Sequence, residues 1–210
     1  MVVQGSGAQA DYLTISSGGM EDNGFIRGGS EIMASGAAAL GDPVYDGGSV
    51  TVQSGGVVSG QEVLYDGTMT VENGGFASMV IIESGTLEVA RGAVGGVYFY
   101  NSGADELVSD AAGTFHGTVA DLGAGDQIDL AGVAFAPTVK KGQVGLSTSG
   151  GSSTLTVTDG VHTASVELLG AYMASEFVAT SDGDGGSLIT FTSATSTNGH
   201  GNAVAAAVTS

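Results

Sequence analysis

Apolar and polar residues alternate in short segments along the first half of the chain. Residues 49–53 read Ser-Val-Thr-Val-Gln, residues 68–72 read Thr-Met-Thr-Val-Glu, and residues 86–90 read Thr-Leu-Glu-Val-Ala. A period of two residues is typical of a β-strand, because successive side chains of a strand point to opposite faces. The pattern therefore predicts strands with one apolar face and one face of Ser, Thr, Gln, Glu and Asp.

The strands belong to a repeat in which an apolar residue is followed three positions later by Gly. Successive units start 18, 19, 19 and 18 residues apart. Their first residues are Ile15, Met33, Val52, Val71 and Val89. Val108 follows after another 19 residues, with Ala111 in place of the glycine. A second glycine lies 10 to 12 residues after the first, at Gly28, Gly47, Gly67, Gly85 and Gly103.

A unit of about 19 residues with two strands and two glycine turns has the length of one coil of a β-solenoid. We therefore predict an all-β fold, a right-handed parallel β-helix in which equivalent residues stack at the spacing of paired strands. The stack requires glycine at each corner, either for positive φ or for close approach of one coil to the next. One inward row is predicted to be Ile15, Met33, Val52, Val71, Val89 and Val108, and a second Val50, Met69, Leu87 and Leu107. A β-sandwich with Gly-rich hairpins would have no reason to keep this period.

The pattern divides the chain into three parts. Residues 1–113 hold the solenoid repeats, residues 114–192 form a final, longer coil and a β-rich cap, and residues 193–210 are a flexible tail that could carry a secretion signal. Within the cap, strands are predicted at 153–158, 164–169 and 187–192, and a short helical turn within 171–178. The pair Asp159-Gly160 is a strong signal for a hairpin turn between the first two strands.

Composition and charge narrow the possible partners. The chain has 22 acidic and only 4 basic residues, for a net charge of −18. This charge would repel nucleic acid and anionic membrane surfaces. No apolar run is long enough to insert into a membrane, and residues 1–10 lack the features of a Sec signal peptide. The absence of cysteine excludes disulfides and thiolate chemistry.

Aspartates gather in two Gly-rich segments and supply oxygen ligands of the kind that Ca²⁺ prefers. The candidate ligands are Asp121, Asp126, Asp129, Asp182 and Asp184. The tandem Ca²⁺-binding nonapeptide and the EF-hand spacing are both lacking. These aspartates could equally be structural turn residues, so Ca²⁺ is the one possible cofactor and none is certain.

The sequence favours a protein that is not an enzyme. The three histidines, His116, His162 and His200, are far apart, and no nucleophile elbow or zinc-protease motif is present. The aromatic set Tyr98, Phe99 and Tyr100 could stack on sugars, although one or two of these rings could instead fill the interior of a coil.

Units such as Val52-Gln-Ser-Gly-Gly56, followed by Tyr65-Asp-Gly67, resemble the passenger repeats of AIDA-type autotransporter adhesins over residues 12–112. The segments 123–130, 155–160, 168–170 and 181–186 are similar to the carboxy-terminal module of alphaproteobacterial surface and matrix proteins exported by type I secretion. These resemblances imply a parallel β-helix, a location outside the cell and an uncleaved export signal near the carboxy terminus.

From these observations we expect a secreted structural or adhesive protein of the cell surface or the biofilm matrix. It would associate with itself into an oligomer or filament, because a solenoid end exposes unpaired strand edges. The predicted contact residues are Asp11, Tyr12, Leu13, Thr14 and Ile15 in the first coil, and Leu188, Ile189, Thr190 and Phe191 in the last strand. Two alternatives remain open: a β-helix module that binds or degrades surface polysaccharide, and a stalk within a larger secreted protein.

Overall fold

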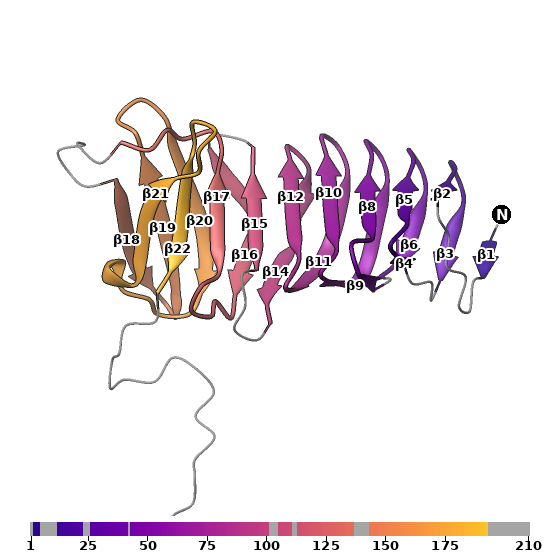
Figure 1. The fold of residues 1–210 in the computed structure, drawn as a ribbon, viewed down its shortest axis with the longest axis horizontal. Helices are drawn as coiled ribbons and strands as arrows, with labels where there is room; N and C mark the ends of the chain where they lie inside the picture. The colour runs from indigo at the N-terminus through magenta and orange to yellow at the C-terminus, as the bar shows by residue number, and fades with distance from the viewer. Residues whose placement is uncertain are drawn as a thin grey trace, which may run out of the picture.

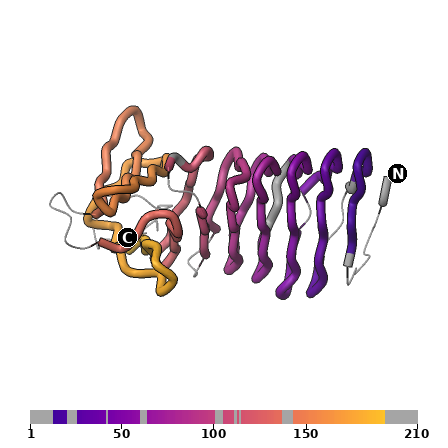
Figure 2. Tube along the Cα trace, turned by 90° about the horizontal axis from the view of Figure 1, so that it is seen from above, coloured from indigo at the N-terminus to yellow at the C-terminus, as the bar shows by residue number. Residues whose placement is uncertain are grey.

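The computed structural model describes residues 2–4, 12–22, 26–41, 43–100, 105–110, 113–136 and 143–192. Asp11, Gly103, Ala111 and His200 lie outside this set, as does the predicted tail at 193–210. The chain winds into a row of flattened coils that follow one another along the long axis of the molecule, and a β-rich cap closes one end (Figures 1 and 2). The predicted β-solenoid with coils of about 19 residues is confirmed.

Two sheets run the length of the rod, and in the coils their strands pair in parallel. The first, sheet B, has nine strands in a single spatial order. That order is β2 (Tyr12–Ile15), β5 (Ser30–Met33), β8 (Ser49–Val52), β10 (Thr68–Glu72), β12 (Thr86–Ala90), β15 (Glu106–Ser109), β17 (Gln127–Leu130), β22 (Ser187–Phe191) and β21 (Phe177–Ser181).

Sheet A has thirteen strands and covers the opposite side of the core. Its main order is β1 (Val2–Gln4), β3 (Met20–Asp22), β6 (Ala38–Leu40), β9 (Val57–Tyr65), β11 (Phe76–Glu83), β14 (Gly96–Phe99), β16 (Thr114–Ala120), β20 (Thr163–Leu169), β19 (Ser152–Thr158) and β18 (Val144–Ser149). Three short strands pair beside this path: β4 (Ile26–Arg27), β7 (Val44–Tyr45) and β13 (Ala93–Val94). The one helix among the described residues is the 3₁₀ turn η1 (Ala174–Glu176).

The inward rows of sheet B follow the predicted repeat, with one correction. Ile15, Met33, Val52, Val71 and Val89 pair in turn from coil to coil and are at most 5% exposed. Val50, Met69, Leu87 and Leu107 form the second row, also buried.

The prediction that Val108 points inward is wrong. Val108 pairs with Glu88 on the outer face, and Ser109 takes the inward position opposite Val89. The coil that leads to β15 is one residue longer than the predicted spacing, and a shift of one residue moves a strand's side chains to the other face.

Glycine at the corners provides both of the predicted features, a positive φ and close approach of one coil to the next. Gly18, Gly36, Gly55 and Gly74 have φ of 74–82°, and each donates or accepts a 2.8 Å backbone hydrogen bond with the glycine of a neighbouring coil. At the next corner Arg91 takes the positive φ, and Gly92 instead allows close approach. A Cβ at Gly92 would lie 2.4 Å from Val71 Cγ1 and 2.6 Å from the Val71 carbonyl oxygen.

The cap starts where strand direction changes. The segment 114–130 is one further coil, as predicted, because β16 and β17 each continue a parallel ladder. Beyond it, β22 of sheet B pairs with β17 in the antiparallel direction. In sheet A, β20 still pairs with β16 in parallel, and its other edge pairs with β19 in an antiparallel hairpin. The hairpin turn at Asp159-Gly160 and the helical turn within 171–178 are confirmed. Strands β18 and β21 were not predicted.

Asp159 joins the cap hairpin to the last coil. Its carboxylate accepts backbone N–H groups from Val161 at 2.7 Å, from His162 at 2.6 Å and from Ala134, in the loop after β17, at 3.3 Å. The Nδ1 atom of His162 lies 2.9 Å from the same carboxylate. These backbone and side-chain hydrogen bonds from His162 hold the pKa of Asp159 well below its usual range.

Replacing Gly92 by alanine should destabilise the solenoid by about 1–3 kcal/mol, because the new methyl group meets backbone that cannot move without breaking the ladder. Gly145→Ala is the matched control, since its Cβ would find only the Thr156 carbonyl oxygen at 3.8 Å. Denaturant unfolding measures both. Equal stability of the two variants would show that coil contact at this corner is not tight.

Candidate functional site

The first candidate surface is the strand edge at the N-terminal end of the rod. Strand β2 is the terminal strand of sheet B, and among the described residues it pairs only with β5. It contains Tyr12, Leu13, Thr14 and Ile15, four of the residues predicted for self-association. These four residues therefore lie at an end of the stack of coils (Figure 1).

The other predicted contact is not at an edge. Leu188, Ile189, Thr190 and Phe191 lie in β22, which pairs with β17 on one side and with β21 on the other. The prediction of a free edge in this segment is wrong, because β21 was missed and covers it. Within the described chain, the terminal strands at the cap end are β21 in sheet B and β18 in sheet A.

The predicted calcium ligands do not form one site. Asp126 is buried and accepts a hydrogen bond from the Gly123 N–H at 2.6 Å, and Asp121 has φ of 60° at a turn. The Asp182 carboxylate accepts the N–H groups of residues 184, 185 and 186 at 2.8–2.9 Å and so closes its own turn. No group of three or more His, Cys, Asp or Glu among the described residues could hold a metal ion. Ca²⁺ binding stays a prediction.

Asp129 instead lies in a region of concentrated negative charge. It is half-buried, and its Oδ1 atom has no hydrogen-bond partner among the residues that the structure describes. Burial and, after it, the charges of Asp182, Glu106, Asp110 and Asp184 together raise the pKa of Asp129 to about 6. Asp129 and Asp182 come together only because β22 returns beside β17.

A second buried carboxylate, Asp105, was not predicted. It is fully buried at a corner of the solenoid and accepts the N–H of Ser84 from the preceding coil. Burial raises its pKa to about 6, against the opposing effect of the backbone hydrogen bonds that it accepts. Its position before β15, at a corner of the coil, suits a carboxylate that stabilises the turn rather than a catalytic acid.

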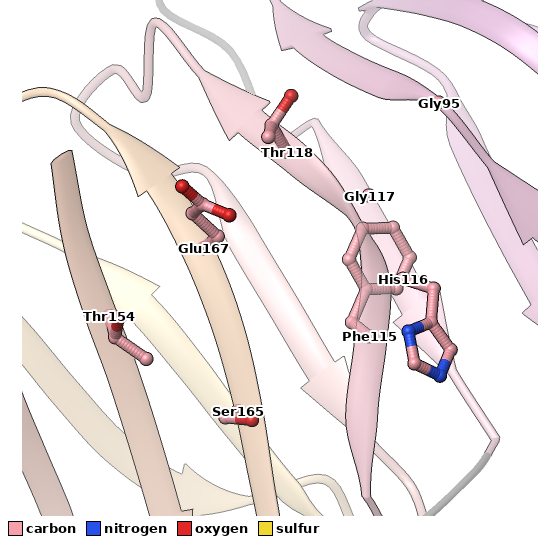
Figure 3. A pocket seen from close by; sticks show the side chains of 8 residues that line it. All are labelled: Gly95, Phe115, His116, Gly117, Thr118, Thr154, Ser165 and Glu167. Carbon is pink, nitrogen blue, oxygen red and sulfur yellow. The ribbon is translucent and has the colours of Figure 1, made fainter.

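A pocket of about 410 Å³ lies on sheet A at the junction between the last coil and the cap. Its lining comes from β16, β19, β20 and Gly95, the residue between β13 and β14 (Figure 3). The residues are Gly95, Phe115, His116, Gly117, Thr118, Thr154, Ser165 and Glu167. His116 and Glu167 are exposed, so the pocket opens to solvent. We define these eight residues as the junction pocket.

The junction pocket combines one imidazole, one carboxylate and three hydroxyl groups. Glycoside hydrolysis commonly uses a pair of carboxylates, and Glu167 is the only carboxylate in this pocket. The other described histidine, His162, is engaged with Asp159 at the hairpin turn. The chemistry of the pocket therefore suits hydrogen bonding of a polar ligand better than acid–base cleavage.

The predicted aromatic set is divided between the two faces of sheet A. Phe99 points inward and is 2% exposed, Tyr98 is half-buried, and Tyr100 is 56% exposed. The structure adds a stacked pair, Tyr45 and Tyr65, with ring centroids 4.8 Å apart and planes within 6°. The repeated Tyr-Asp-Gly at 45–47 and 65–67 is the sequence signal that could have predicted this pair.

The stacked pair has few ring faces left for a sugar. Each ring covers one face of the other, and the Arg27 guanidinium lies 5.8 Å from the Tyr45 centroid while pairing with Asp46 at 3.0 Å. Sugar stacking needs an open ring face. We therefore interpret the pair as part of the stack of coils, in which like residues meet at the strand spacing.

No protein-family model, curated protein or solved structure matches this chain. The resemblance to adhesin repeats and to type I secreted surface proteins therefore rests on the sequence motifs alone. Among the described residues, no helix has the length and hydrophobicity needed to cross a bilayer.

The raised pKa of Asp129 predicts a pH-dependent stability. The folded state holds this proton up to about pH 6, whereas an unfolded chain releases it near pH 4. The stability that the neutral carboxyl of Asp129 contributes to the folded state is thus fully present below about pH 4. It is lost as the pH rises through about 6. Asp129→Asn should therefore raise stability at pH 7.5 by about 2 kcal/mol, and by much less at pH 4.5.

Thermal melts at the two pH values measure this difference. Asp66→Asn, at an exposed turn where φ is 52°, is a control that removes one surface charge and keeps the backbone geometry. If both variants changed the melting temperature equally at both pH values, Asp129 would have no special environment.

Proposed function

We propose that this protein is a non-catalytic structural protein, a rigid rod that assembles end to end through its N-terminal coil. The observation that carries the proposal is the edge of β2, which continues the register of sheet B but pairs, among the described residues, only with β5. Unpaired strand edges readily add another strand. At the cap end the last strands of sheet B pair in the antiparallel direction, and β21 is its terminal strand there.

The backbone of β2 presents hydrogen-bonding groups at this edge. The Ile15 carbonyl accepts the Ala34 N–H at 3.0 Å, so the peptide groups of Ile15 face β5. Because alternate residues of a strand direct their N–H and C=O to opposite edges, those of Thr14 face away from β5. Leu13 is only partly buried, whereas the equivalent Met69 and Leu87 are fully buried. A further strand would cover both features.

The cap end offers the complementary edges. Strand β21 ends sheet B there, and its Val178 is 46% exposed. Pairing of β2 with β21 of the next copy would join unlike surfaces, and such contacts propagate without closing. Assembly would then give filaments. Pairing of two β2 edges with each other would instead stop at a dimer.

The charge of the chain supports contact at the ends over contact along the sides. With a net charge of −18 on 210 residues, rods that lie side by side repel one another at low salt. Higher ionic strength, or Ca²⁺, would reduce the repulsion and promote assembly.

We place this activity outside the cell, at the surface or in the extracellular matrix. The support for this location is the resemblance of the repeats to adhesin passengers and of residues 123–186 to type I secreted proteins. A stiff solenoid, whose strands satisfy one another's backbone groups from coil to coil, suits a load-bearing or adhesive role there.

Thr14→Pro should abolish end-to-end assembly, because proline removes the N–H that faces the open edge. The fold should persist, since proline is tolerated on an edge strand whose N–H faces solvent. Thr14→Val is the matched control, which keeps the N–H and the β-branched shape. Electron microscopy and light scattering at raised ionic strength measure particle length and mass.

We expect filaments from the wild type and the valine variant, and monomers from the proline variant with an unchanged melting temperature. A wild-type protein that stays monodisperse at every salt and Ca²⁺ concentration would overturn the proposal. Discrete dimers in place of filaments would reject pairing with β21 and indicate that two β2 edges meet.

A further inference from the structure

We propose that the junction pocket binds one neutral sugar unit of a polysaccharide. The pocket arises from a mismatch in strand length. Thr114 pairs with Ser165 and Thr118 with Glu167, so three residues of β16 lie opposite the single residue Val166 of β20. The extra residues form a bulge, and bulges often re-aim side chains next to functional sites. The backbone register therefore creates the pocket without any ligand.

The glycines of the pocket keep one wall free of side chains. A Cβ at Gly95 would lie 2.4 Å from the Ser78 carbonyl oxygen, and a Cβ at Gly117 would lie 2.5 Å from that of Val94. Both contacts are with backbone of the preceding coil, so no other residue fits without moving it. At these two positions the wall of the pocket therefore consists of backbone alone.

Polar side chains converge on this space from three strands. Figure 3 shows Phe115 and His116 on one side, and Thr154, Ser165 and Glu167 on the other. Among the hydrogen bonds of the described residues, none engages the side chain of His116, Thr118, Thr154 or Glu167. These four side chains, from β16, β19 and β20, are available to donate to and accept from a ligand.

The chemistry of the lining selects the class of ligand. Hydroxyls, an imidazole and a carboxylate match the alternating donors and acceptors of sugar hydroxyl groups. The Phe115 ring is 7% exposed and belongs to the core, so it forms part of the floor of the pocket and does not stack on a ligand. Glu167 and the net charge of −18 disfavour uronic acids and phosphates. A volume of about 410 Å³ is at the small end for ligand pockets, which suits a single sugar unit.

The place of the pocket separates this activity from assembly. It lies on sheet A, whereas the two edges proposed for assembly, β2 at the opposite end of the rod and β21 at the cap end, both belong to sheet B (Figure 1). A filament could therefore carry one such pocket per copy. Sugar binding would tether the rod to a polysaccharide matrix.

The test is an amide NMR titration of the full chain with D-glucose, D-galactose and N-acetyl-D-glucosamine, and with D-glucuronate as the anionic comparison. We expect at least one neutral sugar to shift the amides of 115–118 and 165–167, with millimolar affinity and little response to glucuronate. Thr154→Val, which replaces the hydroxyl by a methyl group of similar size, should weaken binding about fivefold. Glu167→Gln should weaken it by a similar or larger factor.

The control is Glu72→Gln on sheet B, which removes an equal charge away from the pocket and should leave the affinity unchanged. No shift with any neutral sugar would overturn the proposal, as would shifts confined to other surfaces or equal affinity of all variants. Because the readout is the chemical shift of pocket amides, failure here leaves end-to-end assembly standing, and failure of assembly leaves sugar binding standing.

Discussion

The structure depends on the stacking of coils in register. Each coil donates and accepts backbone hydrogen bonds with its neighbours, so every position must be compatible with the same position above and below it. The chain of 2.8 Å bonds from Gly18 through Gly36 and Gly55 to Gly74 shows this constraint at one corner. Positive φ or close backbone approach is repeated at each corner, and glycine meets both requirements.

The same constraint explains how an acidic surface is tolerated. Outward residues of successive coils meet at the strand spacing, where like charges repel. Thr70 therefore donates a hydrogen bond to Glu88 at 3.1 Å, so that the carboxylate lies next to a hydroxyl of the adjacent coil. Where carboxylates of different segments do converge, around Asp129, burial and repulsion raise its pKa to about 6. The destabilising repulsion between carboxylates is thus concentrated where the cap meets the last coil.

Departures from the repeat create the special features of the molecule. The longer coil before β15 places Ser109 rather than Val108 inside. The bulge in β16 opens the junction pocket, and the reversal of direction at β22 ends the parallel ladder. A uniform solenoid would have an open strand edge at each end and featureless sides. This rod has one end that continues the register, one that is capped, and a pocket between coil and cap.

The sequence by itself determined the class of fold, the coil length, the glycine corners, the hairpin at Asp159-Gly160 and most inward residues, because period-two alternation and glycine are local signals.

Tertiary structure decided the register. In β5, Glu31 lies inside at 3% exposure between Leu13 and Val50, while Ile32 faces outward, the reverse of what hydrophobicity alone indicates. The covering of Leu188–Phe191 by β21, the approach of Asp182 to Asp129 and the junction pocket arise from pairing between distant segments. Such pairing is selected by the summed hydrogen bonds and packing of the whole ladder, and no single segment encodes it.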